Sequence, residues 1–195
     1  MLSEKVLSLS SGYGKEAWLL QAGTPIARKI TRDVKWPVAI GIFDYNAIVV
    51  QYSTRPYSEF VLQGSTVNKH FKLFNSAMGQ AFLAFCEKDQ LNSILEDLRN
   101  DELNDEAILK DEFAIRRYIA DVRARGYGLR KGNRGESTHM ALPIKSDNEV
   151  IGVIGISIFS SCFNGTVAQE YLTLLKQSAM EIIASMDQMM AVAEM

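Results

Sequence analysis

Residues 75–85 read Asn-Ser-Ala-Met-Gly-Gln-Ala-Phe-Leu-Ala-Phe. Met78, Phe82 and Phe85 follow one another at spacings of four and three residues, with alanines between them, which is typical of a helix with one buried face. The preceding residues 64–72 show no clear period, so we expect a long loop there. The stretch therefore predicts a loop that leads into a buried helix rich in small residues.

The sequence on the N-terminal side of this helix predicts strands. Val38–Phe43 and Ala47–Tyr52 are rich in β-branched and aromatic residues and are separated by three turn-forming residues, which predicts a hairpin. A third strand is expected at Glu59–Gln63. Before the hairpin we expect two helical pieces within residues 12–33, because Thr24-Pro25 is typical of an N-cap followed by a first-turn proline.

The sequence on the C-terminal side contains both helix and strand signals. Its predicted elements are a helix at Lys88–Leu98, a helix from the N-cap Asn104 to Gly126, strands at Ser137–Ile144 and Val150–Phe159, and a last helix that opens with the capping-box pair Thr166 and Gln169.

The order of these elements predicts the fold class. A helix, three strands, helices, two or three strands and a last helix favour an α+β domain in which helices flank an antiparallel sheet. GAF-like and PAS-like sensor domains have this organisation, which is a profilin-like architecture. The length of 195 residues suits one compact domain with a helical extension.

The composition excludes several classes of protein. A formal charge of −2 and a pI near 5.8 leave no excess of cations for phosphates, so this chain alone is not expected to bind nucleic acid. The sequence lacks the run of about 18 apolar residues that a membrane span needs, and it begins with no signal-peptide pattern. We therefore expect a cytoplasmic protein. Cys86 and Cys162 adjoin apolar stretches and are expected to be buried free thiols.

Several segments in the right order resemble the effector-binding domain of IclR-family bacterial transcriptional regulators, whose sensor is GAF-like. The resemblance extends from about Leu9 to Ile183, and residues 75–85 are similar to the family's small-residue helix. The other matching segments are Leu9–Tyr13, Val38–Asp44, Arg125–Tyr127 and Val150–Ser157.

This resemblance implies a function and a division of the chain. In the family, a small organic effector controls DNA binding or activation by a winged helix-turn-helix domain that precedes the sensor. We expect that domain to be absent here, with residues 1–23 forming a connector segment and helix and residues 24–195 the effector-binding domain. Residues 34–37 resemble members that regulate the catabolism of aromatic acids, which implies an aromatic carboxylate. The family also implies a homodimer or homotetramer that contacts DNA only through the absent domain.

The resemblance also places a ligand site between the sheet and its covering helix. Backbone amides at the start of the helix within residues 75–86 suit a carboxylate, and strand side chains would add hydrogen bonds. The residues that match family positions, and are therefore candidates for ligand binding, are Phe60, Leu73, Ala77, Met78, His139, Gly155 and Ser157, with Trp36 closing one end.

The same residues also have purely structural explanations. The large apolar candidates are ordinary core side chains in any domain of this kind. His139 is equally well explained as a hydrogen-bonded histidine of the core or its rim, and Ser157 as a partner for a neighbouring backbone group. We expect the basic residues within 130–134 to form a solvated turn.

Two other functions suit a GAF-like fold. One is a sensor module of another signalling protein. The other is a small redox enzyme like the free methionine sulfoxide reductases, which need reactive cysteines in loops; Cys86 and Cys162 have no electropositive neighbours in the sequence. His70 and His139 are the only histidines, and without Cys or His neighbours they make a poor metal site. We therefore expect a protein that is not an enzyme and that needs no cofactor or metal.

Overall fold

The computed structural model describes residues 4–60, 65–101, 106–133 and 135–193. Its strands form one antiparallel sheet in the order β3-β2-β1-β6-β5-β4. The strands are β1 (Val38–Asp44), β2 (Ala47–Ser53), β3 (His70–Lys72), β4 (Gly128–Arg130), β5 (Ser137–Ser146) and β6 (Glu149–Phe159). The helices are α1 (Glu4–Val34), α2 (Ala77–Phe85), α3 (Lys88–Asn100), α4 (Glu112–Arg125) and α5 (Gly165–Ala193), and short 3₁₀ helices are η1 (Arg55–Tyr57), η2 (Ala107–Lys110) and η3 (Ser160–Cys162).

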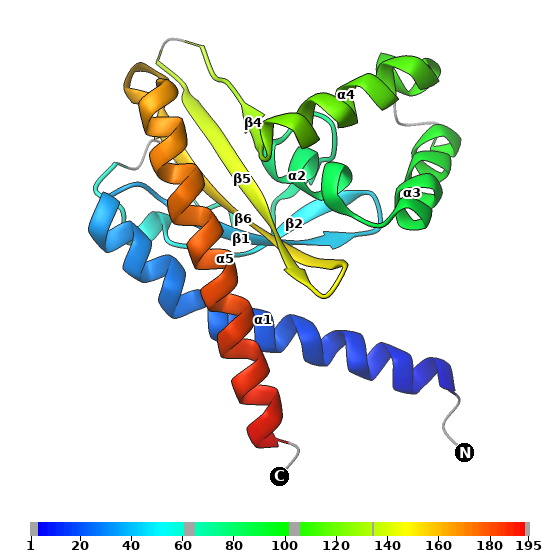
Figure 1. Ribbon diagram of the computed structural model, residues 1–195, viewed down its shortest axis with the longest axis horizontal. Coiled ribbons are helices and arrows are strands. Elements are labelled where there is room, and N and C mark those ends of the chain that lie inside the picture. Colours follow the sequence, from blue (N-terminus) through cyan, green and yellow to red (C-terminus); the bar gives the residue numbers. More distant parts are fainter. Residues whose placement is uncertain (1–3, 61–64, 102–105, 134, 194–195) are drawn as a thin grey trace.

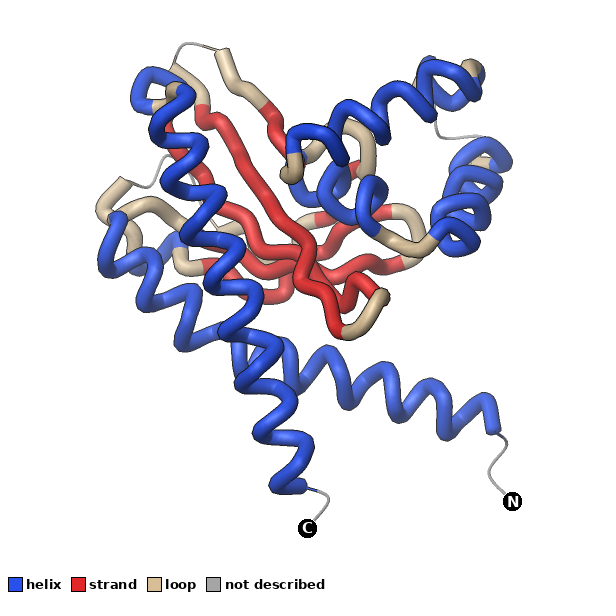
Figure 2. The backbone as a smooth tube through the Cα atoms, viewed as in Figure 1, coloured by secondary structure: helices blue, strands red, loops and turns tan. Residues whose placement is uncertain are grey.

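Helices cover both faces of the sheet (Figure 1). The long helices α1 and α5 cross each other on one face, and α2, α3 and α4 lie over the other. Figure 2 shows the sheet as a single layer between these two groups. Two hydrophobic clusters result, one between the sheet and the α1–α5 pair and one between the sheet and α2 to α4. This α+β arrangement confirms the predicted GAF-like fold class.

The three central strands carry large side chains on one face and small ones on the other. The face towards α1 and α5 holds aliphatic side chains such as Ile40, Leu142 and Ile154, all at most 4% exposed. On the opposite face, Ala39 pairs with Gly155 and Gly155 pairs with Ala141, so a row of small residues crosses β1, β6 and β5. Successive residues of a strand point to opposite faces, so one face of the sheet can carry large side chains while the other carries small ones.

Helix α2 lies over the small-residue face and is held there by close backbone contacts. A Cβ at Gly128, the first residue of β4, would collide with the carbonyl oxygen of Ala77, and a Cβ at Gly79 would collide with the backbone of Leu73. The side chain of Gln80 adds a specific bond, because its Oε1 accepts from the backbone N–H of Leu129 (3.0 Å). The start of α2 is thereby fixed relative to β4 and β5.

The prediction of two helical pieces before the hairpin is wrong. Helix α1 runs without a break through Thr24-Pro25, and Figure 1 shows it changing direction near its middle. A proline inside a helix removes a hydrogen bond and costs about 3 kcal/mol. Burial of Leu19 and Ala22 before the proline and of Ala27 and Ile30 after it offsets this cost. The helix is therefore continuous across residues 23 and 24, where the sequence predicted a boundary.

The third strand also differs from the prediction. Glu59 and Phe60 are not in a strand, and the rest of the predicted segment reaches beyond the described residues. The strand that pairs with β2 is instead His70–Lys72, within the stretch expected to be irregular. It is only three residues long, and so short an edge strand leaves no readable period.

Two helix starts and one cysteine also differ from expectation. Helix α4 begins at Glu112, where Asp111 Oδ1 accepts from the amides of Phe113 and Ala114; the predicted N-cap Asn104 lies outside the described residues. At the start of α5, Asn164 Oδ1 accepts from the Val167 amide (3.0 Å), so Asn164 is the cap in place of Thr166. Cys162 is exposed on η3, whereas Cys86 is buried as predicted.

The close approach of α2 to β4 makes a testable prediction. Gly128→Ala should lower the free energy of unfolding by about 3 kcal/mol or more, because its Cβ has no room beside the backbone of α2. Gly14→Ala, in α1 with open space around it, should instead raise stability by about 0.5–1 kcal/mol. Urea unfolding followed by circular dichroism measures both, and equal stability of Gly128→Ala and wild type would contradict the packing described for α2.

Candidate functional site

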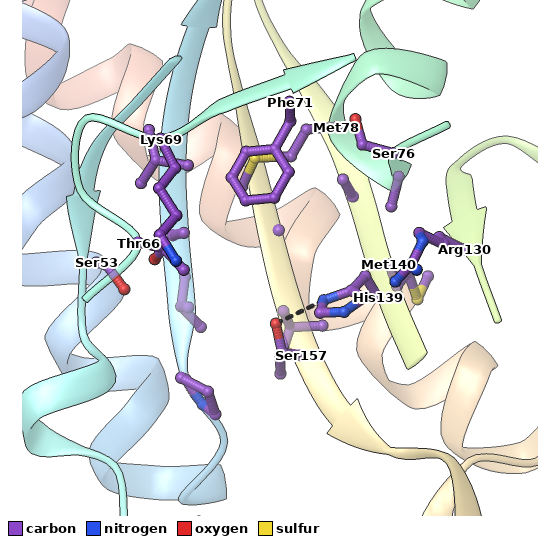
Figure 3. Close-up of a pocket in the computed structure, with 18 of the residues that line it drawn as sticks. Ser53, Thr66, Lys69, Phe71, Ser76, Met78, Arg130, His139, Met140 and Ser157 are labelled. Carbon is purple, nitrogen blue, oxygen red and sulfur yellow. Dashed lines mark hydrogen bonds between the residues drawn. The ribbon is translucent and has the colours of Figure 1, made fainter. Parts of the chain in front are cut away.

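A cavity of about 440 Å³ lies between the small-residue face of the sheet and the start of α2 (Figure 3). The small residues Ala39, Ala141 and Gly155 leave this space, because larger side chains at these positions would fill it. The described residues that line it are Pro37, Val38, Ala39, Val50, Ser53, Arg55, Thr66, Lys69, Phe71, Asn75, Ser76, Ala77, Met78, Arg130, His139, Met140, Ala141, Gly155, Ile156 and Ser157.

Five of the candidate residues come together at this cavity. Ala77 and Met78 approach it from the first turn of α2, and His139, Gly155 and Ser157 approach it from β5 and β6. The two strands bring His139 opposite Ser157 in register. Their role in ligand binding stays a prediction, but the geometry that the prediction requires is present.

The other three candidates lie outside the cavity. Trp36 belongs to the hydrophobic cluster on the α1–α5 face, and its ring packs on Phe60 (4.5 Å between centroids) and Phe159 (5.1 Å). Phe60 is therefore held against Trp36 and does not reach the lining. Leu73 is 1% exposed and packs in the cluster beneath α2. For Leu73 and Trp36 the purely structural explanation is the better one.

His139 and Ser157 form a hydrogen-bonded pair in the wall of the cavity. The His139 Nδ1 and Ser157 Oγ atoms are 2.8 Å apart. Burial, together with the nearby cations Arg130 and Arg55, lowers the pKa of His139 to about 4. The imidazole is therefore neutral at pH 7 and offers one donor and one acceptor. The pair is equipped to bind oxygen atoms of a polar ligand.

The first turn of α2 presents backbone amides to the cavity. Ser76 is the N-cap: its Oγ accepts from the Gly79 amide (3.0 Å), and its carbonyl accepts from the Gln80 amide. The amides of Ala77 and Met78 come before these two and have no acceptor within the helix. Because the N-terminal end of a helix carries a partial positive charge, this turn favours an anionic group.

Cationic side chains that the sequence analysis did not select also line the cavity. Arg55 comes from η1, Lys69 from the segment before β3, and Arg130 from the end of β4, where it pairs with His139. No aspartate or glutamate belongs to the lining among the described residues. We expected Arg130 in a solvated turn, and its place in the sheet beside His139 was not visible in the local sequence. Arg55 and Lys69 carried no sequence signal.

Other kinds of site find little support in the described chain. Burial raises the pKa of the Cys86 thiol to about 11, so this cysteine is not a thiolate at neutral pH. Within residues 4–60, 65–101, 106–133 and 135–193, no three His, Cys, Asp or Glu side chains gather as a metal ion would require. In the same ranges, no helix combines the length and the apolar character of a membrane span.

Comparisons with known proteins agree with this picture. The family described as "Bacterial transcriptional regulator IclR C-terminal" matches residues 12–184. The HTH-type transcriptional regulator KdgR of Escherichia coli (strain K12) is 25% identical over 193 residues, covering 95% of this chain and 70% of KdgR.

Two solved structures show the same fold. The C-terminal domain of E. coli KdgR superposes with a TM-score of 0.68 at 24% identity, covering 87% of this chain and 98% of that one. An IclR homologue from Microbacterium hydrocarbonoxydans, solved in complex with 4-hydroxybenzoate, gives a TM-score of 0.68 at 19% identity, covering 87% of this chain and 68% of that one.

The predicted resemblance is confirmed, because the family match spans most of the chain and the fold agrees. Members of this family are transcriptional regulators and not enzymes, which agrees with the prediction from the sequence. This chain belongs to the IclR family of bacterial transcriptional regulators and forms their C-terminal, effector-binding domain.

Proposed function

We propose that the cavity binds a small organic carboxylate, and that this binding controls DNA binding or activation by the regulator's DNA-binding module. The observation that carries the proposal is the charge of the lining. Lys69 and Arg130 contribute positive charge without an ion-pair partner among the described residues, and the described part of the lining contains no carboxylate. An anionic ligand would supply the balancing charge.

The carboxylate itself is best placed near the start of α2. The amides of Ala77 and Met78 face the cavity there, and the dipole of α2 adds a favourable potential. His139 and Ser157 stand on the sheet side of the same space, as Figure 3 shows. A carboxylate between them would accept hydrogen bonds from both walls.

We propose that the rest of the ligand is aromatic. The Phe71 ring and the Met78 thioether lie on the cavity side of β3 and α2, where a flat apolar group would pack against them. The resemblance of residues 34–37 to regulators of aromatic catabolism supports this class. So does the Microbacterium hydrocarbonoxydans homologue, whose complex holds 4-hydroxybenzoate. A cavity of about 440 Å³ falls within the usual range for small-molecule sites.

A route from the cavity to α1 supports control of a distant module. Thr54 lies between Ser53 and Arg55, both in the lining, and its hydroxyl is buried 2.6 Å from that of Thr31 on α1. A second hydrogen bond joins α1 to the end of β2, because Arg28 Nε donates to the Tyr52 hydroxyl (2.6 Å). We propose that a ligand which prefers one position of η1 also prefers one position of α1.

The wider context of the regulator is proposed from the family. We propose that the protein is cytoplasmic and works as a homodimer or homotetramer, with residues 1–23 leading to the DNA-binding module. The side chains of Trp18, Met189 and Val192 line a shallow apolar cavity between α1 and α5, and Val192 is 74% exposed. Such a surface suits contact with a second copy.

The first test of this function is calorimetric titration with a panel of benzoate, 4-hydroxybenzoate, hexanoate and pyruvate. At least one carboxylate should bind, and Ser157→Ala should weaken its binding about three- to tenfold by removing one hydrogen bond. Ser161→Ala, exposed on η3 outside the cavity, should leave the dissociation constant unchanged. If none of the four carboxylates binds, the proposal of a carboxylate effector is contradicted.

The pKa of His139 predicts a pH dependence of this binding. A bound carboxylate favours the imidazolium, so it should raise the pKa of His139 from about 4, and binding should be accompanied by proton uptake. Affinity should therefore increase as pH falls from 7.5 to 5.5. In His139→Gln this increase should disappear, whereas His70→Gln, on the exposed strand β3, should retain it. Titrations at both pH values measure the effect, and an unchanged slope in His139→Gln would rule out this histidine as its source.

The proposed route to α1 is tested by hydrogen exchange. The carboxylate that binds most tightly in the panel should alter amide exchange both in residues 53–58 and in residues 26–34 of α1. In Arg28→Ala the first change should persist and the second should become smaller, because one tie between the segments is lost. Arg32→Ala, exposed on the same helix, is the matched control. Equal changes in α1 of both variants would show that Arg28 does not carry the coupling.

A further inference from the structure

Two unpaired cations stand on different sides of the cavity. In Figure 3 the Lys69 side chain extends into the space from the segment before β3, whereas Arg130 lies with His139 and Ser157 on the opposite side. The lining near Lys69 also contains the hydroxyls of Ser53 and Thr66. The cavity therefore has two polar ends.

Neither of these cations has a partner within the part of the chain that the structure describes. The ion pairs found there join other residues, and the side chains of Lys69 and Arg130 take part in no hydrogen bond. Both side chains are exposed, and the described lining contains no carboxylate that could pair with them. Each of the two ends can therefore accept an anionic group from a ligand.

The space between the two ends is mainly apolar. Phe71 and Met78 line it, together with the small residues of β1 and β6. A carboxylate held at the start of α2 and beside His139 would complete the Arg130 end but would not reach across to Lys69. A ligand with one acidic group would therefore place no negative charge beside Lys69.

Resting on the proposed binding of an organic carboxylate, we propose that the ligand is a small dianionic acid with acidic groups at both ends. One carboxylate binds at the α2 amides, Arg130 and His139, and the second binds at Lys69 with the Ser53 and Thr66 hydroxyls. A ring or short chain between them fills the apolar middle of the cavity. The ligand class is thereby narrowed from carboxylates in general to dicarboxylates.

The experiment compares acids that differ only in the second carboxylate. Dissociation constants are measured by calorimetry for benzoate and benzene-1,4-dicarboxylate, and for hexanoate and hexanedioate as a flexible pair. In at least one pair the diacid should bind about tenfold more tightly than the monoacid, because it completes a second charge-assisted contact. In Lys69→Gln that ratio should fall to about one, while the affinity for the monoacid should stay within about twofold of wild type.

The matched control is Lys29→Gln, an exposed lysine of α1 outside the cavity, which should keep the full diacid preference despite the same loss of charge. Circular dichroism confirms that each variant is folded before titration. The proposal is overturned if neither diacid binds more tightly than its monoacid, or if the preference survives in Lys69→Gln. Binding of monoacids without a diacid preference would leave the proposed function standing and overturn only this inference, whereas silence of all four acids would overturn both.

Discussion

The distance between α2 and the sheet is the constraint on which the rest of this site depends. Gly128 lets the backbone of β4 approach the start of α2, and Gly79 lets the chain turn closely from Leu73 into the helix. Next to that contact, the paired residues Ala39, Gly155 and Ala141 have side chains too short to fill the space above the sheet. A helix pressed against the sheet at one point and a sheet without bulky side chains beside it enclose a cavity of defined size. Backbone contacts and small residues therefore contribute to the volume of the site.

The two faces of the sheet divide stability and binding between them. Large aliphatic side chains on the α1–α5 face bury apolar area and supply most of the hydrophobic stabilisation there. The opposite face carries the polar groups, and their burial has a cost, because His139 is kept neutral beside two arginines. The polar residues that line the cavity lie on the face opposite the α1–α5 cluster, so the proposed binding of a ligand would not disturb that cluster.

The sequence correctly predicted the helices and strands that have a clear pattern within their own residues. The hairpin at β1 and β2, helix α2 and the long strands β5 and β6 each have a clear turn signal, helical period or β-rich composition, whereas Gly155 and Ser157, which line the cavity, were selected by family position. Pro25 misled the prediction because packing on the sheet overrides a local helix breaker. Phe60 was assigned to the site by family position and Trp36 as a residue closing one end, but their rings pack on each other, with Trp36 in the cluster on the α1–α5 face. Arg55, Lys69 and Arg130 enter the cavity from three separate segments, and only the tertiary fold brings such residues together.

The continuity of α1 has a geometrical consequence for any module connected to its N-terminal end. Its 31 residues, at about 1.5 Å each, follow a path about 46 Å long that bends near the middle of the helix. Arg28 and Thr31 contact Tyr57 of η1 and its N-cap Thr54 close to the other end of this helix, and Figure 1 shows its first turns extending beyond the sheet. In a helix that turns as one body, a rotation of about 5° displaces a point about 30 Å from the pivot by about 2.6 Å. Under the proposed coupling, α1 would therefore convert a small shift near the cavity into a larger displacement at its N-terminal end.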